Sequence, residues 1–142
     1  MERITLQPLK WMEILEIGVP EIDMDHRDLL QECNDLTAMV GNDGSWPEIA
    51  AAARQMFEHC LAHFRLEEEF LTKSGFPRLD SHVGEHVRIA KKLEQLVDAM
   101  GKAGAPEAEK LLSLEALRAV LVDILLRHDL DYKSHLLTAQ GR

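Results

Sequence analysis

Apolar residues recur at steps of three and four along most of this chain, which is the pattern of amphipathic α-helices. Four such segments follow one another, at residues 26–40, 49–71, 82–100 and 114–132. The stretches "GNDGSWPE", "KSGFPR" and "GKAGAP" separate them, and each combines glycine with proline. Ser45 and Glu48 form a capping box over Pro47, which predicts the start of the second helix.

The order of these segments predicts an all-α fold. Helices joined by short connections favour an up-down-up-down antiparallel four-helix bundle, here over about residues 22–138. Residues 1–21 show no sustained period, so we expect an N-terminal arm packed along the bundle. A length of 142 residues corresponds to one domain, 1–142, with a core of useful size.

The composition limits the classes of partner that can be expected for this chain. The chain has 25 acidic against 16 basic residues, which argues against nucleic acid and anionic membranes as partners. No apolar run reaches membrane-spanning length and no secretion signal is apparent, so the expected location is cytoplasmic. Cys33 and Cys60 lie within helical apolar stripes, which predicts two buried free thiols. No protein partner can be inferred.

Five polar residues interrupt the apolar stripes: His26, His63, Glu67, His82 and His86. Residues four apart share one helix face, so His63 with Glu67, and His82 with His86, can each converge on one centre. In an antiparallel bundle the start of one helix is level with the end of the next. The five side chains are therefore expected at one end of the bundle, where the end of the fourth segment adds His128, Asp129 and Asp131.

A carboxylate in this position needs a partner. Burying Glu67 unpaired would cost several kcal/mol, and cations among the imidazoles remove that penalty. Nitrogen and oxygen ligands without a nearby thiolate suit iron, with manganese or zinc as less favoured alternatives. Bridging carboxylates in a helical bundle favour a two-metal site. Glu68 and Glu69 are expected to face solvent or to make outer contacts to the ligands.

At this point the sequence resembles the hemerythrin family, specifically the bacterial hemerythrins. The matching pieces are "WMEILEIGVPEIDMDHRDLL", "HFRLEEEFL", "FPRLDSHVGEH" and "DLDYKSHL", in the family's order. The resemblance implies a four-helix bundle with a non-haem di-iron centre, oxo- or hydroxo-bridged, that binds O2 or another small diatomic ligand. The metal ligands that it implies are His26, His63, Glu67, His82, His86 and Asp129. His26 and His63 resemble the pair on the oxygen-binding iron, and Glu67 resembles one of the two bridging carboxylates.

The chain departs from the family pattern in the fourth segment. The family pattern there is Trp-Leu-x-x-His-Ile-x-x-x-Asp, and the corresponding stretch is "VLVDILLRHD". Asp129 takes the place of the second bridge, Val120 replaces the tryptophan, and Ile124 stands where the third histidine of the second iron is expected. His128 lies one helical turn from Ile124 and is a candidate substitute.

Three functions remain open at this stage. The first is an O2-binding protein used for storage, delivery or sensing. The second is a di-iron oxidase or peroxidase that uses coordination positions opened by Ile124, because open metal sites carry out chemistry. The third is an iron-handling bundle with a partly lost site.

Overall fold

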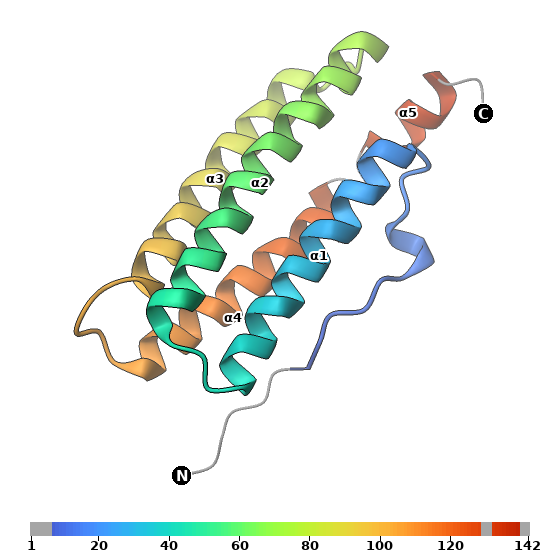
Figure 1. Ribbon diagram of the computed structural model, residues 1–142. Coiled ribbons are helices and arrows are strands. Elements are labelled where there is room, and N and C mark those ends of the chain that lie inside the picture. The colour runs from blue at the N-terminus through green and yellow to red at the C-terminus, as the bar shows by residue number, and fades with distance from the viewer. Residues whose placement is uncertain (1–6, 129–131, 140–142) are drawn as a thin grey trace.

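The computed structural model describes residues 7–128 and 132–139, apart from the side chains of residues 127, 128 and 139. Four long helices form the body of the molecule: α1 (Pro20–Gly41), α2 (Trp46–Ser74), α3 (Leu79–Met100) and α4 (Glu107–Asp123). Consecutive helices run in opposite directions and pack side by side (Figure 1). Within the described ranges there is no strand, so the predicted all-α bundle is confirmed. None of these helices is long and apolar enough to cross a membrane.

The second helix begins and ends where the sequence predicts. The Ser45 hydroxyl accepts a hydrogen bond of 3.3 Å from the backbone N–H of Glu48, which satisfies a donor at the start of α2. Gly75 ends α2 with φ of 71°, a left-handed conformation that glycine adopts without steric cost. The sharp turn that follows brings the start of α3 level with the end of α2.

The fourth segment differs from the single continuous helix that its apolar pattern predicts. The α-helical geometry of α4 ends at Asp123 and continues as the π-helical turn η2 (Ile124–His128). A short helix, α5 (Lys133–Ala139), follows later in the chain and packs against the end of α2. Apolar spacing does not separate an α turn from a π turn, and π turns occur often at functional sites.

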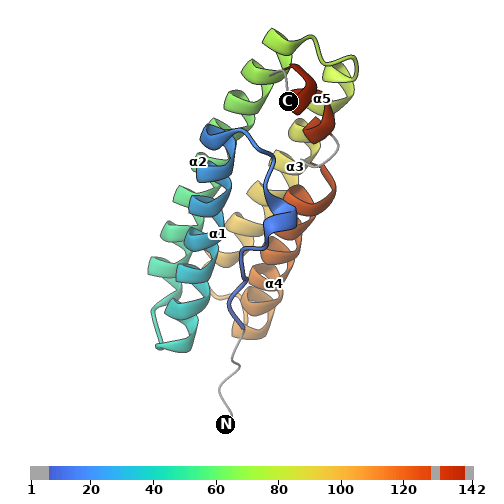
Figure 2. The same ribbon diagram turned by 90° about the vertical axis from the view of Figure 1, so that its right-hand side faces the viewer.

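The N-terminal arm lies over the seam between α1 and α4, as Figure 2 shows. It contains one short 3₁₀ helix, η1 (Glu13–Leu15). The side chain of Asn34 accepts a 2.7 Å hydrogen bond from the Leu9 N–H and donates one of 2.8 Å to the Leu9 carbonyl. The Arg27 guanidinium lies 4.7 Å from the centre of the Trp11 ring. These contacts confirm an arm packed along the bundle.

The entry from the arm into α1 is fixed by Asp23. Its carboxylate accepts hydrogen bonds from the backbone N–H groups of Ile17 (2.7 Å) and Gly18 (3.0 Å). Gly18 has φ of 94°, and a Cβ at this position would lie 2.6 Å from Leu137 Cδ2, so a larger residue would clash there. This junction sets the position of the first turns of α1, which carry His26.

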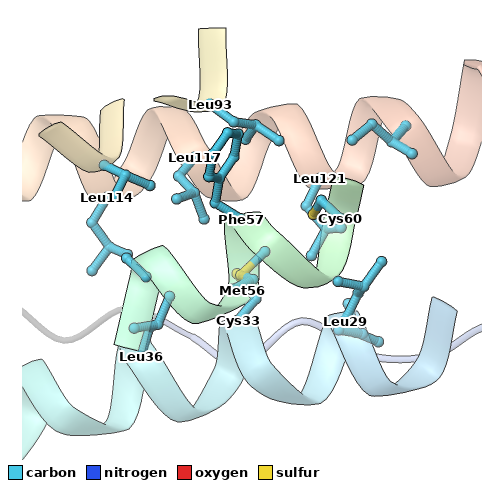
Figure 3. Packing of buried hydrophobic residues seen from close by; sticks show 14 of the residues in the cluster. Leu29, Cys33, Leu36, Met56, Phe57, Cys60, Leu93, Leu114, Leu117 and Leu121 are labelled. Carbon is cyan, nitrogen blue, oxygen red and sulfur yellow. The ribbon is translucent and has the colours of Figure 1, made fainter. Parts of the chain in front are cut away.

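Two apolar clusters fill the bundle. The main core occupies most of its length and includes Leu29, Cys33, Leu36, Met56, Phe57, Cys60, Leu93, Leu114, Leu117 and Leu121 (Figure 3). The end cluster consists of Ile17, Val19, Ile22, Leu71, Phe76, Tyr132 and Leu136. Both cysteines are buried and free, as expected.

Candidate metal centre

Glu67 lies on α2 with no exposed surface, and four imidazole nitrogens surround its carboxylate. Its Oε2 atom is 3.1 Å from Nε2 of His26 and 2.8 Å from Nε2 of His63. Its Oε1 atom is 3.1 Å from Nε2 of His86 and 3.7 Å from Nε2 of His82. Each carboxylate oxygen therefore faces one pair of histidines. The four-residue spacing predicted the pair of His82 and His86, whereas the pair of His26 and His63 followed from the family resemblance.

The bundle places these residues in one layer. His26 lies in the second turn of α1, His63 and Glu67 towards the end of α2, and His82 and His86 at the start of α3. On α1, α2 and α3 this layer separates the two apolar clusters in sequence. Ile22, Leu71 and Leu79 lie on its end-cluster side, and Leu29, Cys60 and Ile89 lie on its main-core side. The predicted convergence of five side chains is what the structure has.

The electrostatics of Glu67 favour its ionised form. Burial alone would raise the pKa of its carboxyl group. The charge of His63, hydrogen bonds with His26 and His63 and the nearby His82 imidazole outweigh burial, and they hold the pKa well below its ordinary value. The site therefore holds a carboxylate anion inside an apolar bundle.

Two of the histidines are oriented from behind by acidic side chains. Nδ1 of His63 lies 2.6 Å from Oδ2 of Asp25, and Nδ1 of His86 lies 2.7 Å from Oε2 of Glu68. A histidine that binds a metal through one ring nitrogen commonly donates the N–H of the other to a carboxylate, which fixes the tautomer and the ring angle. Both rings thus direct Nε2 into the layer. The sequence left open whether Glu68 faces solvent or makes an outer contact to a candidate ligand, and the structure shows the contact with His86.

Tyr132 is a member of the site that the sequence did not identify. It is completely buried, and its hydroxyl donates a 2.5 Å hydrogen bond to Oε2 of Glu67. Its ring contacts those of His82, at 5.1 Å between centroids, and Phe76, at 6.5 Å. The only sequence signal was its place on the apolar stripe of the fourth segment, and that signal equally describes a core tyrosine.

Aromatic rings form the apolar wall of the layer. The Phe64 ring stacks on His86 with centroids 4.1 Å apart and planes 11° apart. Phe76 meets His82 edge-on at 6.2 Å. These rings limit the movement of the imidazoles and keep the surroundings of the carboxylate apolar.

Among the residues that the structure describes, two overlapping sets of side chains could each hold a cation. The potential ligand atoms of His26, His63 and Glu67 lie within 4.8 Å of one another, and so do those of Glu67, His82 and His86. Every member of both sets is buried. Imidazoles around a shared carboxylate are a donor set that suits iron, manganese or zinc. A metal pair bridged by Glu67 therefore fits the residues present.

The metal-ligand predictions for the fourth segment stay predictions. Asp129, expected as the second bridge, and Asp131 lie outside the described residues, as does the side chain of His128. Ile124 is 2% exposed and packs in the main core, at the point where α4 becomes the π turn. Its relation to the second metal position stays a prediction.

Comparison with known proteins agrees with this arrangement. The family model for the hemerythrin HHE cation binding domain matches residues 17–138. A bacteriohemerythrin of Clostridium acetobutylicum is 29% identical over 87 residues, which cover 59% of this chain and 67% of that protein. A bacteriohemerythrin of Campylobacter jejuni is 22% identical over 116 residues, which cover 82% of this chain and 83% of that protein. One from Stenotrophomonas maltophilia is 24% identical over 87 residues, covering 61% and 56%.

The matched region contains the five convergent side chains and Tyr132, and it spans more than half of the chain. This family-model match, together with the four-helix bundle and the carboxylate that faces two histidine pairs, shows that the chain belongs to the hemerythrin family.

Proposed function

We propose that this protein binds O2 reversibly at a non-haem di-iron centre. The observation that carries the proposal is the geometry of the Glu67 carboxylate: its two buried oxygens each face a separate pair of imidazoles. A bridging carboxylate between two cations explains both the burial of the anion and the pairing of the histidines. The bacteriohemerythrin name of the three relatives supports the same function.

His26 and His63 would hold one iron and His82 and His86 the other, with Glu67 between them. An iron pair held there would supply the redox chemistry for reversible O2 binding. The protein orients the imidazoles and keeps water away from them. Asp25 and Glu68 hold two of the imidazoles by Nδ1, while Phe64 and Phe76 cover the imidazoles with apolar rings.

The proposal includes the fourth segment. Asp129 is proposed as the second bridging carboxylate, and Ile124 as the residue in place of a third histidine on the second iron. An isoleucine offers no donor atom. The iron held by His82 and His86 would therefore have one protein ligand fewer than in a relative with five histidines.

The test is metal analysis combined with optical spectra of protein produced with ample iron. We expect up to two irons per chain and a new visible absorption when O2 is added to the reduced protein. The absorption should disappear when O2 is removed and return when it is added again. Protein that takes up no iron, or iron-loaded protein whose spectrum ignores O2, would contradict the proposed function.

A second candidate function is a di-iron oxidase. It is favoured by the buried Ile124, because an isoleucine at the proposed ligand position supplies no donor atom and would leave a coordination position of the metal open. The two candidate functions differ in whether the protein consumes O2. An O2-binding protein keeps its absorption in the presence of a reductant for as long as O2 is present, whereas an oxidase consumes O2 continuously, which an oxygen electrode measures.

A further inference from the structure

Three side chains outside the two candidate metal-binding sets form a hydrogen-bonded row that ends on the proposed ligand His63. They are Asp25, His59 and Glu32. His63 meets Asp25 at 2.6 Å, and the other oxygen of Asp25 lies 2.6 Å from Nε2 of His59. The remaining nitrogen of His59, Nδ1, meets Glu32. The exposed fraction of the side chains rises along this row, from 0% at His63 to 22% at Asp25, 25% at His59 and 35% at Glu32.

In this arrangement every side-chain oxygen and nitrogen atom of Asp25 and His59 has a hydrogen-bond partner. Both oxygens of Asp25 are engaged, one by each imidazole, and both nitrogens of His59 are engaged, one by each acid. Asp25 and Glu32 are seven residues apart on α1, so they lie two turns apart on one face. His59 reaches that face from α2, one turn before His63.

The consequence for Asp25 is a fixed orientation. A carboxylate with 22% exposure and one partner could rotate towards water, whereas a second hydrogen bond on the opposite oxygen opposes that rotation. Asp25 is then held where it accepts the Nδ1–H of His63. An imidazole that donates this hydrogen bond is a better electron donor to a metal at Nε2.

We propose that His59 is a positioning residue for the metal centre, acting through Asp25 on His63. The inference rests on the proposed metal centre. It adds His59, which is not one of the ligands that the family resemblance implies, as a residue that supports one of them. Its effect should be confined to the metal held by His26 and His63. The other pair has a separate support, because His86 is oriented by Glu68 on α2.

The test compares metal binding by four proteins: wild type, His59→Leu, Asp25→Asn and the double variant. Fe²⁺ affinities are measured anaerobically by titration, and the two irons are resolved by Mössbauer spectroscopy. Substitution of an outer partner of a ligand commonly costs about 10–100-fold in metal affinity. We expect Asp25→Asn to weaken one of the two sites by that amount and to change the spectrum of one iron.

His59→Leu should weaken the same site by no more than Asp25→Asn does, and it should have no further effect when Asp25 is already Asn. His59→Gln retains a donor for Asp25 and should recover most of the loss. Glu68→Gln, the matched control, should change the spectrum of the other iron.

Several outcomes overturn the inference. Unchanged affinities and spectra in His59→Leu would do so, as would full additivity with Asp25→Asn or equal weakening of both sites. If wild type binds two irons and His59→Leu behaves identically, only the role of His59 is wrong. If wild type binds no metal, the proposed function and this inference are both wrong.

Discussion

Tyr132 and Glu67 are 65 residues apart in sequence, and the tyrosine hydroxyl donates a 2.5 Å hydrogen bond to the glutamate inside the bundle. The accepting oxygen, Oε2, is the one that also faces His26 and His63. The carboxylate is therefore supported unevenly, with an extra neutral donor on one oxygen. This contact also ties the chain after the π turn to the metal-binding layer.

Tyr132→Phe should lower the free energy of unfolding of the metal-free protein by about 1.5–3 kcal/mol, because it removes a hydrogen bond to a buried charge while preserving the ring. Urea unfolding followed by circular dichroism measures the change. Phe76→Leu, which alters the neighbouring ring but no hydrogen bond, provides the comparison. A Tyr132→Phe protein as stable as wild type would mean that the hydroxyl contributes nothing to the folded state.

The three consecutive glutamates should respond in a graded way to substitution by glutamine. Glu67→Gln should weaken metal binding most, because it alters the carboxylate shared by both histidine pairs. Glu68→Gln should weaken one of two sites by about 10–100-fold through His86. Glu69 is 64% exposed and pairs with Lys73, so Glu69→Gln should leave metal affinity unchanged. Metal titrations of the three variants give the order, and equal losses at all three would refute the assignment of faces.

Metal removal should destabilise the fold, because a ligand that binds only the folded state stabilises it by mass action. A free metal concentration 100 times the dissociation constant adds about 2.7 kcal/mol. At about 2–4 °C per kcal/mol for a chain of this size, chelation should lower the melting temperature by roughly 5–10 °C. Scanning calorimetry before and after verified removal measures it, and restoring the metal should restore the transition. An unchanged melting temperature would count against the buried centre.

Ile124→His should tighten binding of the second metal and prolong the absorption seen with O2, because it adds an imidazole at the proposed vacant position. Wild type should hold fewer than two metals per chain at limiting iron, or lose the absorption faster. Metal content and decay rate, measured side by side, decide the matter. Ile124→Leu keeps the site apolar and should behave as wild type. If the histidine variant gains neither metal nor lifetime, Ile124 is not at the ligand position.

The stability contributed by His59 should depend on pH. Burial alone would lower its pKa, but hydrogen bonds and charge from Asp25 and Glu32 raise the pKa above the ordinary value of 6.5. The stabilisation is therefore fully present below about pH 6.5 and is lost as the pH rises through the higher pKa of the folded state. The stability difference between metal-free wild type and His59→Gln should shrink from pH 6 to pH 9, and a difference that grows with pH would reverse the sign assigned to this group.

Much of the site could be predicted from sequence because helices carry information at a fixed period. His63 with Glu67, and His82 with His86, are four residues apart, and antiparallel packing places helix ends level with helix starts. Tyr132 could not be predicted in this way. Its position depends on the π turn and on the path into α5, and an apolar stripe carries no signal for either feature. Glu68 was ambiguous because an acid beside a buried face can meet either water or a neighbouring imidazole.

The layer of histidines around Glu67 divides the bundle into a long segment and a short one. The main core fills the long segment, whereas the end cluster has, within the described part of the chain, seven buried members drawn from the arm, α1, α2, the α2–α3 turn, the residue before α5 and α5. A cation bound in the layer would connect three helices at the boundary. In metal-free protein the short segment should then open locally, before the whole chain unfolds. A bound metal would suppress that opening, so metal would decide which part of the bundle becomes exposed first as well as how stable the whole bundle is.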